Sequence, residues 1–454
     1  MMWTLSEAAA HIGGRLQGAD VAFDSVGKDS RGKCRGQLFV ALRGERFDAH
    51  DFVGQARQQG AVAALVDHLV DAAIPQLVVD DTRLALGRLA AAWRRRIGGK
   101  LIAVTGSNGK TTCKEMIAAV LARAGSVHAT QGNLNNDIGM PLTLLAARDQ
   151  DFLVLEMGAN HSGEIAYLTE IARPDVAVIT NAGRAHLEGF GDLEGVARAK
   201  GEIARGLPTD GTFIVPSDSP WTALWREIAA GRRVLTCGPD ASAEVRADTD
   251  GLTGIWDEQG FRTGFKVRLG DEDLSLELGL AGMHNVRNAL VAVAVAEVLG
   301  VGPELVRAGL AGLRPVAGRL YPRRGAAGLR LIDDSYNANP DSVRAAIDVL
   351  AGLPGRRWLV LGDLRELGPE SEDLHRRLGE EAHAAGVDTL YTVGSQSALA
   401  AQSFGAGGRH FPDQASLIAD LRARLGPDDL VLVKGSRLAA MERVADALCE
   451  RSGG

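Results

Sequence analysis

One stretch decides the fold of this chain: residues 101–112 read LIAVTGSNGKTT. The apolar run at 101–104 is typical of a buried strand, and the glycine-rich segment after it leads into a helix-like sequence. A phosphate-binding loop has this composition because glycines allow successive backbone N–H groups to face one anion at a helix N-terminus. Such a loop also needs a lysine for the β- and γ-phosphates and a hydroxyl for Mg²⁺.

The spacing is shorter than the full Walker pattern, which requires a glycine at position 104, where this chain has Val104. The motif is therefore a shortened GxxGKT form, and a purely structural glycine-rich turn is the alternative. We expect a nucleotide-phosphate site. Its candidate residues are Gly106, Ser107, Asn108, Gly109, Lys110, Thr111 and Thr112.

The segments that follow predict a parallel sheet around this loop. Apolar runs at 152–155, 176–179 and 213–215 alternate with helix-like stretches, as expected for strands joined by crossover helices. From about residue 243 to 278 the pattern is strand-rich, with Asp250-Gly251 and Gln259-Gly260 as turn signals. Helices are expected at 284–299 and 303–313.

The flanking regions show the same alternation. Before the loop, apolar runs at 37–42, 61–66 and 77–79 lead to an amphipathic segment at 84–97, which ends in Gly98-Gly99. After it, strands are expected at 329–332, 358–361, 389–393 and 430–433. We predict an α/β protein of three domains: a small α/β N-terminal domain at 1–98, a central P-loop parallel-sheet ATPase domain at 99–313, and a C-terminal Rossmann-like domain at 314–454.

Composition excludes several classes of protein. The chain has 454 residues, a net charge of −7, 46% hydrophobic and 24% charged residues, which is ordinary for a soluble globular protein. No basic run exceeds Arg94-Arg95-Arg96, so nucleic acid is not the expected partner. The sequence contains no apolar run of about 18 residues, so no membrane span is predicted. Four scattered cysteines without a CxxC spacing are typical of reduced thiols, so we expect a cytoplasmic enzyme.

Two side chains follow predicted strands and so belong to one edge of the sheet. Glu156 is placed to hold Mg²⁺, although a strand-end glutamate commonly bonds only to its own loop. His186 is either a ligand or a hydrogen-bonded loop residue. Lys200, taken alone, is expected to be a solvated helix lysine.

Two polar strings add further candidates. Residues 132–137, GNLNND, are either turn chemistry or a source of amide donors for a substrate phosphate or sugar. Residues 333–340, DDSYNANP, follow a strand, where an acidic residue commonly binds ribose hydroxyls. The alternative is a polar loop that caps the next helix.

Together these strings resemble the Mur ligase family, in which the shortened phosphate loop is usual. The resemblance extends over essentially the whole chain. It rests on segments at 38–50, 106–116, 132–137, 158–161, 186–190, 199–203, 284–290, 318–319, 333–339, 362–363 and 434–437. Within the family, residues 334–339 resemble the members that add D-alanyl-D-alanine, and the Asp-Asn-Pro-Arg motif of the members that add the third amino acid is absent from the sequence.

The resemblance implies an ATP-dependent ligase of peptidoglycan biosynthesis that forms an amide bond. ATP would phosphorylate the terminal carboxylate of UDP-N-acetylmuramoyl-tripeptide (UDP-MurNAc-tripeptide), and D-alanyl-D-alanine would attack the acyl phosphate to give the pentapeptide precursor. The first domain would bind the UDP substrate, the central one ATP, and a mobile third one would help to close the site of a monomer. The alternatives are a Mur-type ligase with another amine and a regulatory switch that hydrolyses ATP.

The family also implies roles for individual residues. Catalysis would fall to Lys110, His186, Lys200 and Arg319. Two Mg²⁺ ions would be held by Thr111, Glu156, His186 and Lys200, the last carbamylated by CO₂. The nucleotide would be contacted by Asn285 and Asn288 at adenine, Asp334 and Asn337 at the ribose side, and Arg319 at a phosphate. Substrate-binding candidates are Ser30, Arg31, Arg43, Phe47, Asn133, Asn135, Asn136, Asn160 and His161.

Overall fold

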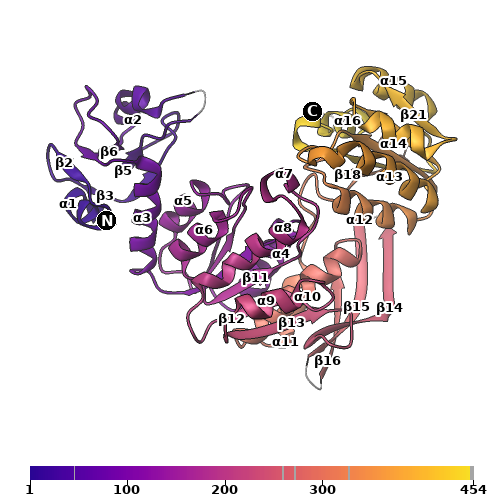
Figure 1. Cartoon of the computed structure of the whole chain (residues 1–454), viewed down its shortest axis with the longest axis horizontal. Helices are drawn as coiled ribbons and strands as arrows, with labels where there is room; N and C mark the ends of the chain where they lie inside the picture. Colours follow the sequence, from indigo (N-terminus) through magenta and orange to yellow (C-terminus); the bar gives the residue numbers. More distant parts are fainter. Residues whose placement is uncertain (45–46, 258–259, 270–271, 326–327, 450–454) are drawn as a thin grey trace.

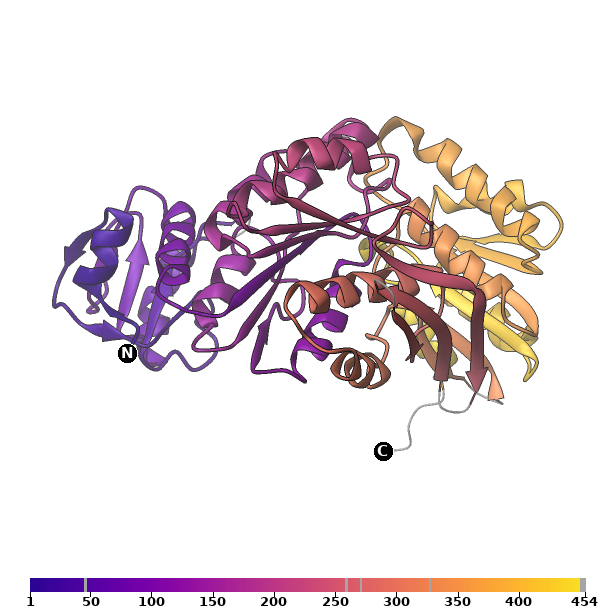
Figure 2. The ribbon, with the colours of Figure 1, turned by 90° about the horizontal axis from the view of Figure 1, so that it is seen from below.

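The computed structural model describes residues 1–44, 47–257, 260–269, 272–325 and 328–449. Over these ranges the chain forms three α/β domains, each with its own main sheet. Figures 1 and 2 show the first and third domains at opposite ends of the molecule, with the central domain between them. The predicted fold class is therefore confirmed, whereas the bounds drawn between the domains stay a prediction.

The first domain has a mainly parallel sheet with one antiparallel edge. Its strand order is β2-β7-β6-β5-β4, and only β2 runs antiparallel to its neighbour among the described strands of this sheet. A small ribbon of β1 and β3 lies beside it. The elements are β1 Trp3–Thr4, α1 Leu5–Ile12, β2 Arg15–Gln17, β3 Ala22–Phe23, β4 Ser25–Gly27, β5 Gln37–Val40, η1 Ala49–Phe52, α2 Val53–Gln58, β6 Ala63–Val66, β7 Gln76–Val78 and α3 Thr82–Arg94.

Helix α3 joins the first domain firmly to the central one. It begins two residues earlier than the sequence indicated, because the Asp81 carboxylate accepts hydrogen bonds from the backbone N–H groups of Arg83 and Leu84. Its buried face shares one apolar core with α5 (Gly139–Ala146) and α6 (Glu164–Ala172) of the central domain. The indole N–H of Trp93 donates to the Ala147 carbonyl at 2.9 Å. The two domains therefore share part of their core.

The central domain contains the predicted parallel sheet. Its described parallel strands follow the order β13-β12-β11-β8-β10-β9, and each predicted apolar run forms one of them. Strand β8 leads into the glycine-rich loop and then into α4. The remaining elements are β8 Lys100–Thr105, α4 Lys110–Leu121, β9 Val127–Ala129, β10 Phe152–Glu156, β11 Val176–Ile179, α7 Leu187–Phe190, α8 Leu193–Gly201, η2 Glu202–Gly206, β12 Thr212–Pro216, α9 Thr222–Ile228 and β13 Arg233–Gly238.

An antiparallel extension continues this sheet through β14 (Val245–Asp257), β15 (Gly260–Leu269) and β16 (Glu272–Leu278). The turn expected at Asp250-Gly251 is wrong, because the chain runs through these residues within β14. The pairing with β15 shifts register between Asp248 and Thr253. The residues that suggested a turn therefore lie at an irregularity within the strand. Gln259, also expected in a turn, lies outside the described residues.

The far end of this extension packs on the third domain. Figure 1 shows β14 and β15 reaching from the central sheet towards α12 (Pro340–Ala351). The rings of Trp256 and Phe261 lie 4.9 Å apart, and Phe261 belongs to the same apolar cluster as Ile347 and Val349 of α12. The extension therefore helps to hold the third domain next to the central one.

Two helices follow the extension, α10 (Met283–Val298) and α11 (Pro303–Ala311), close to their expected positions. Residues 289–296 of α10 are buried, and the helix packs against α4. Across the described ranges, no helix is both long and apolar enough to cross a membrane.

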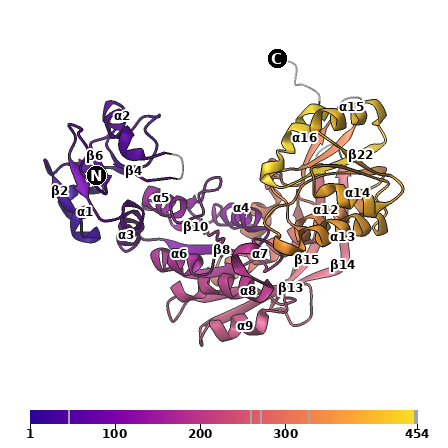
Figure 3. The same ribbon diagram turned by 45° about the horizontal axis from the view of Figure 1, so that its top comes forward.

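The third domain is a sheet covered on both faces. The described strands follow the order β17-β18-β22-β19-β20-β21, parallel except for β17. Helices α12 to α14 pack on one face, while α15 and α16 pack on the other (Figure 3). The remaining elements are β17 Tyr321–Arg324, β18 Arg330–Asp334, β19 Arg356–Gly362, η4 Gly368–Glu370, α13 Ser371–Ala384, β20 Thr389–Val393, α14 Ser397–Phe404, β21 Gly408–Phe411, α15 Gln414–Arg424, β22 Asp429–Lys434, η5 Arg437–Ala439 and α16 Glu442–Leu448.

The shared core around α3 predicts a stability difference between two leucines of one helix. Leu86 is fully buried, whereas Leu84 is 47% exposed. We expect Leu86→Ala to lower the free energy of unfolding by about 2–5 kcal/mol, because it leaves a cavity in a packed core. Leu84→Ala is the matched control and should change it by less than about 1 kcal/mol. Urea unfolding followed by tryptophan fluorescence measures both, and equal losses would contradict the described packing of α3.

Candidate active site

A cavity of about 1260 Å³ lies where the central and third domains meet. Its central-domain wall is formed by loops after β8, β10 and β11, that is, at the carboxyl ends of parallel strands, where α/β proteins bind ligands. The third domain contributes the loop after β18 and the segments around Glu366 and Lys434. The beginning of α3 adds Arg83 from the first domain.

The phosphate loop forms the floor of this cavity, and its two glycines are sterically required. Gly106 has φ 147° and Gly109 has φ 79°, both in the region that favours glycine. A Cβ at Gly106 would lie 2.0 Å from the Thr180 hydroxyl oxygen, and one at Gly109 would lie 2.7 Å from the Asn288 side-chain oxygen. Asn181 braces the loop, because its side-chain oxygen accepts a hydrogen bond from the Asn108 N–H at 2.9 Å.

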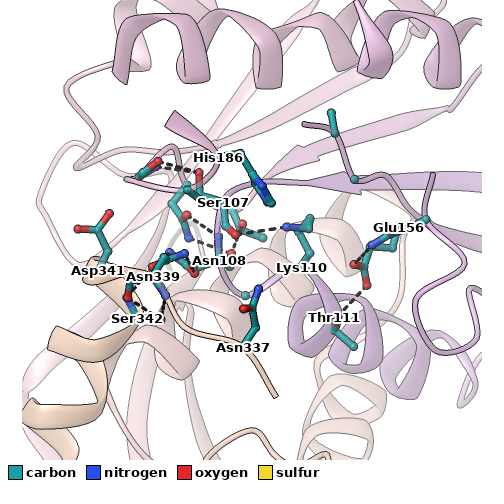
Figure 4. Close-up of a pocket in the computed structure, with 18 of the residues that line it drawn as sticks. Ser107, Asn108, Lys110, Thr111, Glu156, His186, Asn337, Asn339, Asp341 and Ser342 are labelled. Atoms are coloured by element: carbon teal, nitrogen blue, oxygen red, sulfur yellow. Dashed lines mark hydrogen bonds between the residues drawn. The ribbon is translucent and has the colours of Figure 1, made fainter. Parts of the chain in front are cut away.

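The first turn of α4 is open to an anion. Gly109 is the N-cap and supplies no side-chain hydrogen bond to the helix. The Lys110 ammonium donates to the carbonyls of Gly106, at 2.7 Å, and Ser107, at 3.3 Å (Figure 4). Burial lowers the pKa of Lys110, against the opposing charge of Glu156. A phosphate here would meet both the helix N-terminus and the lysine charge.

Side-chain oxygens that could bind a metal ion lie next to this loop around Glu156, which is 2% exposed. One carboxylate oxygen accepts from the Thr111 hydroxyl at 2.9 Å (Figure 4). The other accepts from the Asn135 amide at 2.8 Å. The Thr130 hydroxyl accepts from the Glu156 N–H at 2.9 Å and so fixes the end of β10. Carboxylate and hydroxyl oxygens are the ligands that suit Mg²⁺, so these residues fit such an ion.

Lys200 is not the solvated helix lysine that its sequence position alone suggested. It is 2% exposed, and its Nζ lies 4.9 Å from the centre of the Phe190 ring and 3.5 Å from the Ala159 carbonyl oxygen. Burial, followed by the charge of Lys110, lowers the pKa of Lys200 to about 7. A buried lysine of this kind is partly neutral at physiological pH and can act as a nucleophile.

His186 is the N-cap residue that precedes α7, and it lines the cavity beside Lys110 (Figure 4). Burial lowers its pKa, and the charges of Lys110 and Lys200 act in the same direction, whereas the carboxylate of Glu366 opposes them. The neutral imidazole is the form that binds metals.

The string at 333–340 combines both roles that the sequence left open. Asn339 caps α12 in a capping box with Ser342, whereas Asp334 and Asn337 line the cavity. One oxygen of Asp334 accepts from Lys434 at 2.6 Å and the other from the Leu320 N–H at 3.0 Å. Burial raises the pKa of Asp334, against the opposing effect of Lys434. The carboxylate of Asp334 is thus engaged within its own domain.

The third domain contacts the phosphate loop directly. The side-chain amides of Asn108 and Asn339 exchange two hydrogen bonds, at 2.7 and 3.3 Å (Figure 4). The Arg319 guanidinium donates to the Thr111 hydroxyl at 3.1 Å and stacks 4.3 Å from the centre of the Tyr336 ring. These contacts bring residues more than 200 positions apart to one loop.

Most of the asparagine candidates line the cavity, and one of them also stabilises a turn. Asn133, Asn135, Asn136 and Asn160 line the cavity, and Asn136 also serves the turn, since its side-chain oxygen accepts from the Gly139 N–H at 2.8 Å. His161 is not among the lining residues and pairs with Glu164 at 3.2 Å. Asn285 and Asn288 line the cavity, are each 5% exposed, and are joined at 3.3 Å.

Four substrate candidates in the first domain lie outside the cavity: Ser30, Arg31, Arg43 and Phe47. Arg43 is paired with Asp48 at 3.2 Å and with Asp67 at 3.3 Å, next to His68. Phe47 is 73% exposed, which is unusual for a phenylalanine. The structure does not bring these four residues to the phosphate loop.

Several lining residues escaped the sequence reasoning, namely Asp341, Glu366, Lys434 and Ser436. The Asp341 carboxylate accepts from the Arg184 N–H at 2.7 Å across the domain junction. The Ser436 hydroxyl is buried and is without a hydrogen-bond partner among the described residues. Lys434 and Ser436 lie in a segment that carries the family resemblance and could have been found there. Asp341 and Glu366 carry no comparable local pattern.

Comparisons with known proteins agree with this geometry. Three family models match: the Mur ligase middle domain at residues 104–296, the Mur ligase, glutamate ligase domain at 318–437, and the Mur ligase family, catalytic domain at 22–94. A UDP-N-acetylmuramoyl-tripeptide–D-alanyl-D-alanine ligase of Escherichia coli is 46% identical over 450 residues, with 98% of each chain covered. The chain belongs to the Mur ligase family. It is thus an ATP-dependent enzyme that forms amide bonds.

Solved structures of other Mur ligases have the same fold. MurF from Acinetobacter baumannii is 38% identical with a TM-score of 0.91, and the match covers 99% of each chain. A MurF ligase from Thermotoga maritima in complex with ADP is 30% identical with a TM-score of 0.83, covering 93% of this chain and 96% of that one. The family resemblance that the sequence indicated is therefore confirmed.

The geometry of this Mur ligase predicts a strong dependence on Lys110. Lys110→Ala removes the ammonium next to the helix N-terminus. The negative charge on the transferred phosphoryl group is then no longer stabilised by this cation. We expect kcat for substrate-dependent ADP formation to fall by about 10²–10³-fold, with an unchanged circular dichroism spectrum and melting temperature. Near-normal turnover in the folded variant would contradict the assignment of this loop to phosphate.

Proposed function

We propose that this Mur ligase joins D-alanyl-D-alanine to UDP-MurNAc-tripeptide while ATP is converted to ADP and phosphate. The observation that carries the proposal is one shared cavity. The phosphate loop lines it from the central domain. Residue 334 and residues 336–339, from the segment that resembles the dipeptide-adding members, line it from the third. The full-length similarity to ligases with that name supports the same substrates.

The reaction requires activation of a carboxylate, because a carboxylate does not react with an amine. In the first step an oxygen of the terminal carboxylate attacks the γ-phosphorus, and the bond from that phosphorus to ADP breaks. In the second step the amine of D-alanyl-D-alanine attacks the acyl phosphate carbonyl. Phosphate leaves and the amine loses a proton, so an amide remains.

Two anions must meet in the first step, so the site has to concentrate positive charge. Lys110 lies at the helix N-terminus, where the γ-phosphate is expected, and Arg319 reaches the same place from the third domain. We assign both residues to screening of the transferred phosphoryl group. Because Arg319 comes from the third domain, full screening requires that domain to be docked on the phosphate loop.

Thr111 and Glu156 would hold a Mg²⁺ ion. Their oxygens are 2.9 Å apart and suit a hard cation. When bound, Mg²⁺ would supply positive charge that draws the phosphate oxygens of ATP into one orientation. Asn135 orients the Glu156 carboxylate through its amide.

We assign a second Mg²⁺ to His186 and a carbamylated Lys200, closer to the acceptor carboxylate. An unmodified lysine ammonium would repel the ion. The low pKa of Lys200, about 7, leaves the neutral amine available to add to CO₂. The nitrogen forms a bond to carbon, one proton is released, and a carboxylate with two oxygen ligands replaces the cation.

Carbamylation of Lys200 can be measured directly. With ¹³C-bicarbonate, the wild type should show a carbamate ¹³C resonance that grows as the pH rises through about 7, because only the deprotonated amine reacts. Lys200→Ala should lack this resonance and lose most activity, and added bicarbonate or a small carboxylate should restore part of it. A wild-type spectrum without the resonance, together with no rescue by either anion, would reject the assignment.

Adenosine recognition is assigned to residues of α10 and of the loop after β18, which also line the cavity. Asn285 and Asn288 would contact adenine, since both amides line the cavity and Asn288 lies against the phosphate loop at Gly109. Asp334 and Asn337 would lie at the ribose side. Asp334 is bonded to Lys434, so we expect it to act mainly by fixing that loop.

The UDP end of the substrate is assigned to the first domain. Ser30, Arg31, Arg43 and Phe47 lie away from the phosphate loop, as two nucleotides in one chain require. Asn133, Asn136 and Asn160, which line the cavity, would then contact the part of the substrate between the two nucleotide sites. His161, next to Asn160 in the chain, is assigned to the same part of the substrate. We propose that this enzyme acts as a cytoplasmic monomer.

The exposed ring of Phe47 provides a test of the UDP site. If uracil stacks on it, Phe47→Ala should raise KM for UDP-MurNAc-tripeptide by roughly tenfold, the order expected when base–aromatic stacking is removed. KM for ATP should not change. A variant with an unchanged KM for the UDP substrate would show that Phe47 does not contact it.

The proposed function as a whole is tested by phosphate release against a matrix of UDP-MurNAc peptides and candidate amines. We expect release only with the tripeptide and D-alanyl-D-alanine together. Release with another amine would identify a different Mur-type ligase. ATP hydrolysis that ignores the UDP substrate would identify a regulatory switch, which is the alternative from another class.

A further inference from the structure

One contact across the domain junction involves a residue that the proposed mechanism does not use. Nδ1 of His186, in the central domain, is paired with a carboxylate oxygen of Glu366, in the third domain. Glu366 lies between β19 and η4, and it lines the cavity together with His186. The two residues are 180 positions apart in the chain, so only docking of the third domain brings them together.

Both residues adopt a backbone conformation that their residue types rarely take. His186 has φ 56° and Glu366 has φ 61°, which is the left-handed region. For residues other than glycine this conformation costs about 1 kcal/mol or more, and it is found mainly where the surrounding structure imposes it. Two such residues in contact indicate that both backbones are shaped to bring these side chains together.

The charges around His186 favour a carboxylate as its partner. Lys110, and Lys200 as long as it is unmodified, act on His186 as positive charges, and Glu366 is the opposing negative one. The imidazole side chain is 31% exposed, so its orientation is not fixed by burial alone. A hydrogen bond at Nδ1 is therefore the contact that can hold the ring in one orientation.

We propose that Glu366 is a positioning residue, which accepts the Nδ1–H of His186 and so leaves the lone pair of Nε2 to face the cavity. A carboxylate behind a histidine commonly selects the ring tautomer and orients the other nitrogen towards a ligand. The inference rests on the proposed role of His186 as a ligand-binding residue of this site.

The pair also connects domain docking to the state of the site. Glu366 belongs to the same domain as Asn339 and Arg319, which contact the phosphate loop. When the third domain moves away, His186 loses the acceptor at Nδ1 and its proton can move to Nε2, which removes the lone pair from the cavity. The central domain alone therefore lacks a fixed ligand nitrogen at this position.

The tautomer of His186 is the decisive measurement, and it needs no substrate or metal. In the ligand-free full-length protein labelled with ¹⁵N-histidine, His186→Gln identifies the His186 ring signals. In the wild type we expect the proton on Nδ1. In Glu366→Ala we expect it to shift towards Nε2, whereas Glu366→Gln, whose amide oxygen still accepts a hydrogen bond, should keep it on Nδ1.

Kinetics give the second readout. Glu366→Ala should lower kcat by about 10- to 100-fold, the range seen when a partner behind a ligating histidine is removed, while KM for ATP changes little. Glu366→Gln should recover part of this loss. The matched control is Glu370→Ala, an exposed glutamate four residues further on that does not line the cavity. It should leave both the tautomer and kcat unchanged.

Two results would overturn the inference: an unchanged proton position in Glu366→Ala, or the same shift in Glu370→Ala. The outcome is separate from that of the proposed function. A shifted tautomer in an enzyme that does not use D-alanyl-D-alanine would support the role of Glu366 and refute the substrate. Ligation of D-alanyl-D-alanine with an unshifted tautomer would do the reverse.

Discussion

The site depends on one constraint: the first turn of α4 must be left without a side-chain cap, so that its N–H groups can bind an anion. Only a glycine at position 109 permits this, because its φ of 79° turns the chain sharply and its missing Cβ leaves room for Asn288. Strand β8 then places the turn at the carboxyl edge of the parallel sheet. The ends of β10 and β11 follow at the same edge, and with them Glu156 and the segment that leads to His186.

Positive charge is the second requirement, and Lys110 and Arg319 supply it at the phosphate loop. Lys110 and Lys200 both have a lowered pKa because burial disfavours their ammonium forms. For Lys200 the charge of Lys110 adds to this effect. Such an arrangement is unfavourable without anions and becomes favourable when phosphates and a carboxylate enter. The positively charged side chains are therefore already in place before ATP and the acceptor bind.

The third domain completes this arrangement from a distance. Asn339 reaches Asn108, Arg319 reaches Thr111, and Glu366 reaches His186. Each of these contacts involves a residue that would touch ATP, metal or acceptor, so docking of the third domain and assembly of the site are one event. The β14–β15 extension packs against α12 and supports this docking from the side.

The sequence by itself determined the phosphate loop and the parallel sheet that carries it, and it indicated the candidates Thr111 and Glu156, because these features follow from local backbone chemistry and strand-end positions. It did not predict that Asp250-Gly251 lies within β14, where the pairing with β15 shifts register and resumes at Thr253. Its prediction of a solvated Lys200 is wrong, because the side chain is buried, and it did not find Glu366. Burial and pairing across 180 residues depend on how separate domains pack, and no short-range pattern encodes that distance. The tertiary structure alone decided them.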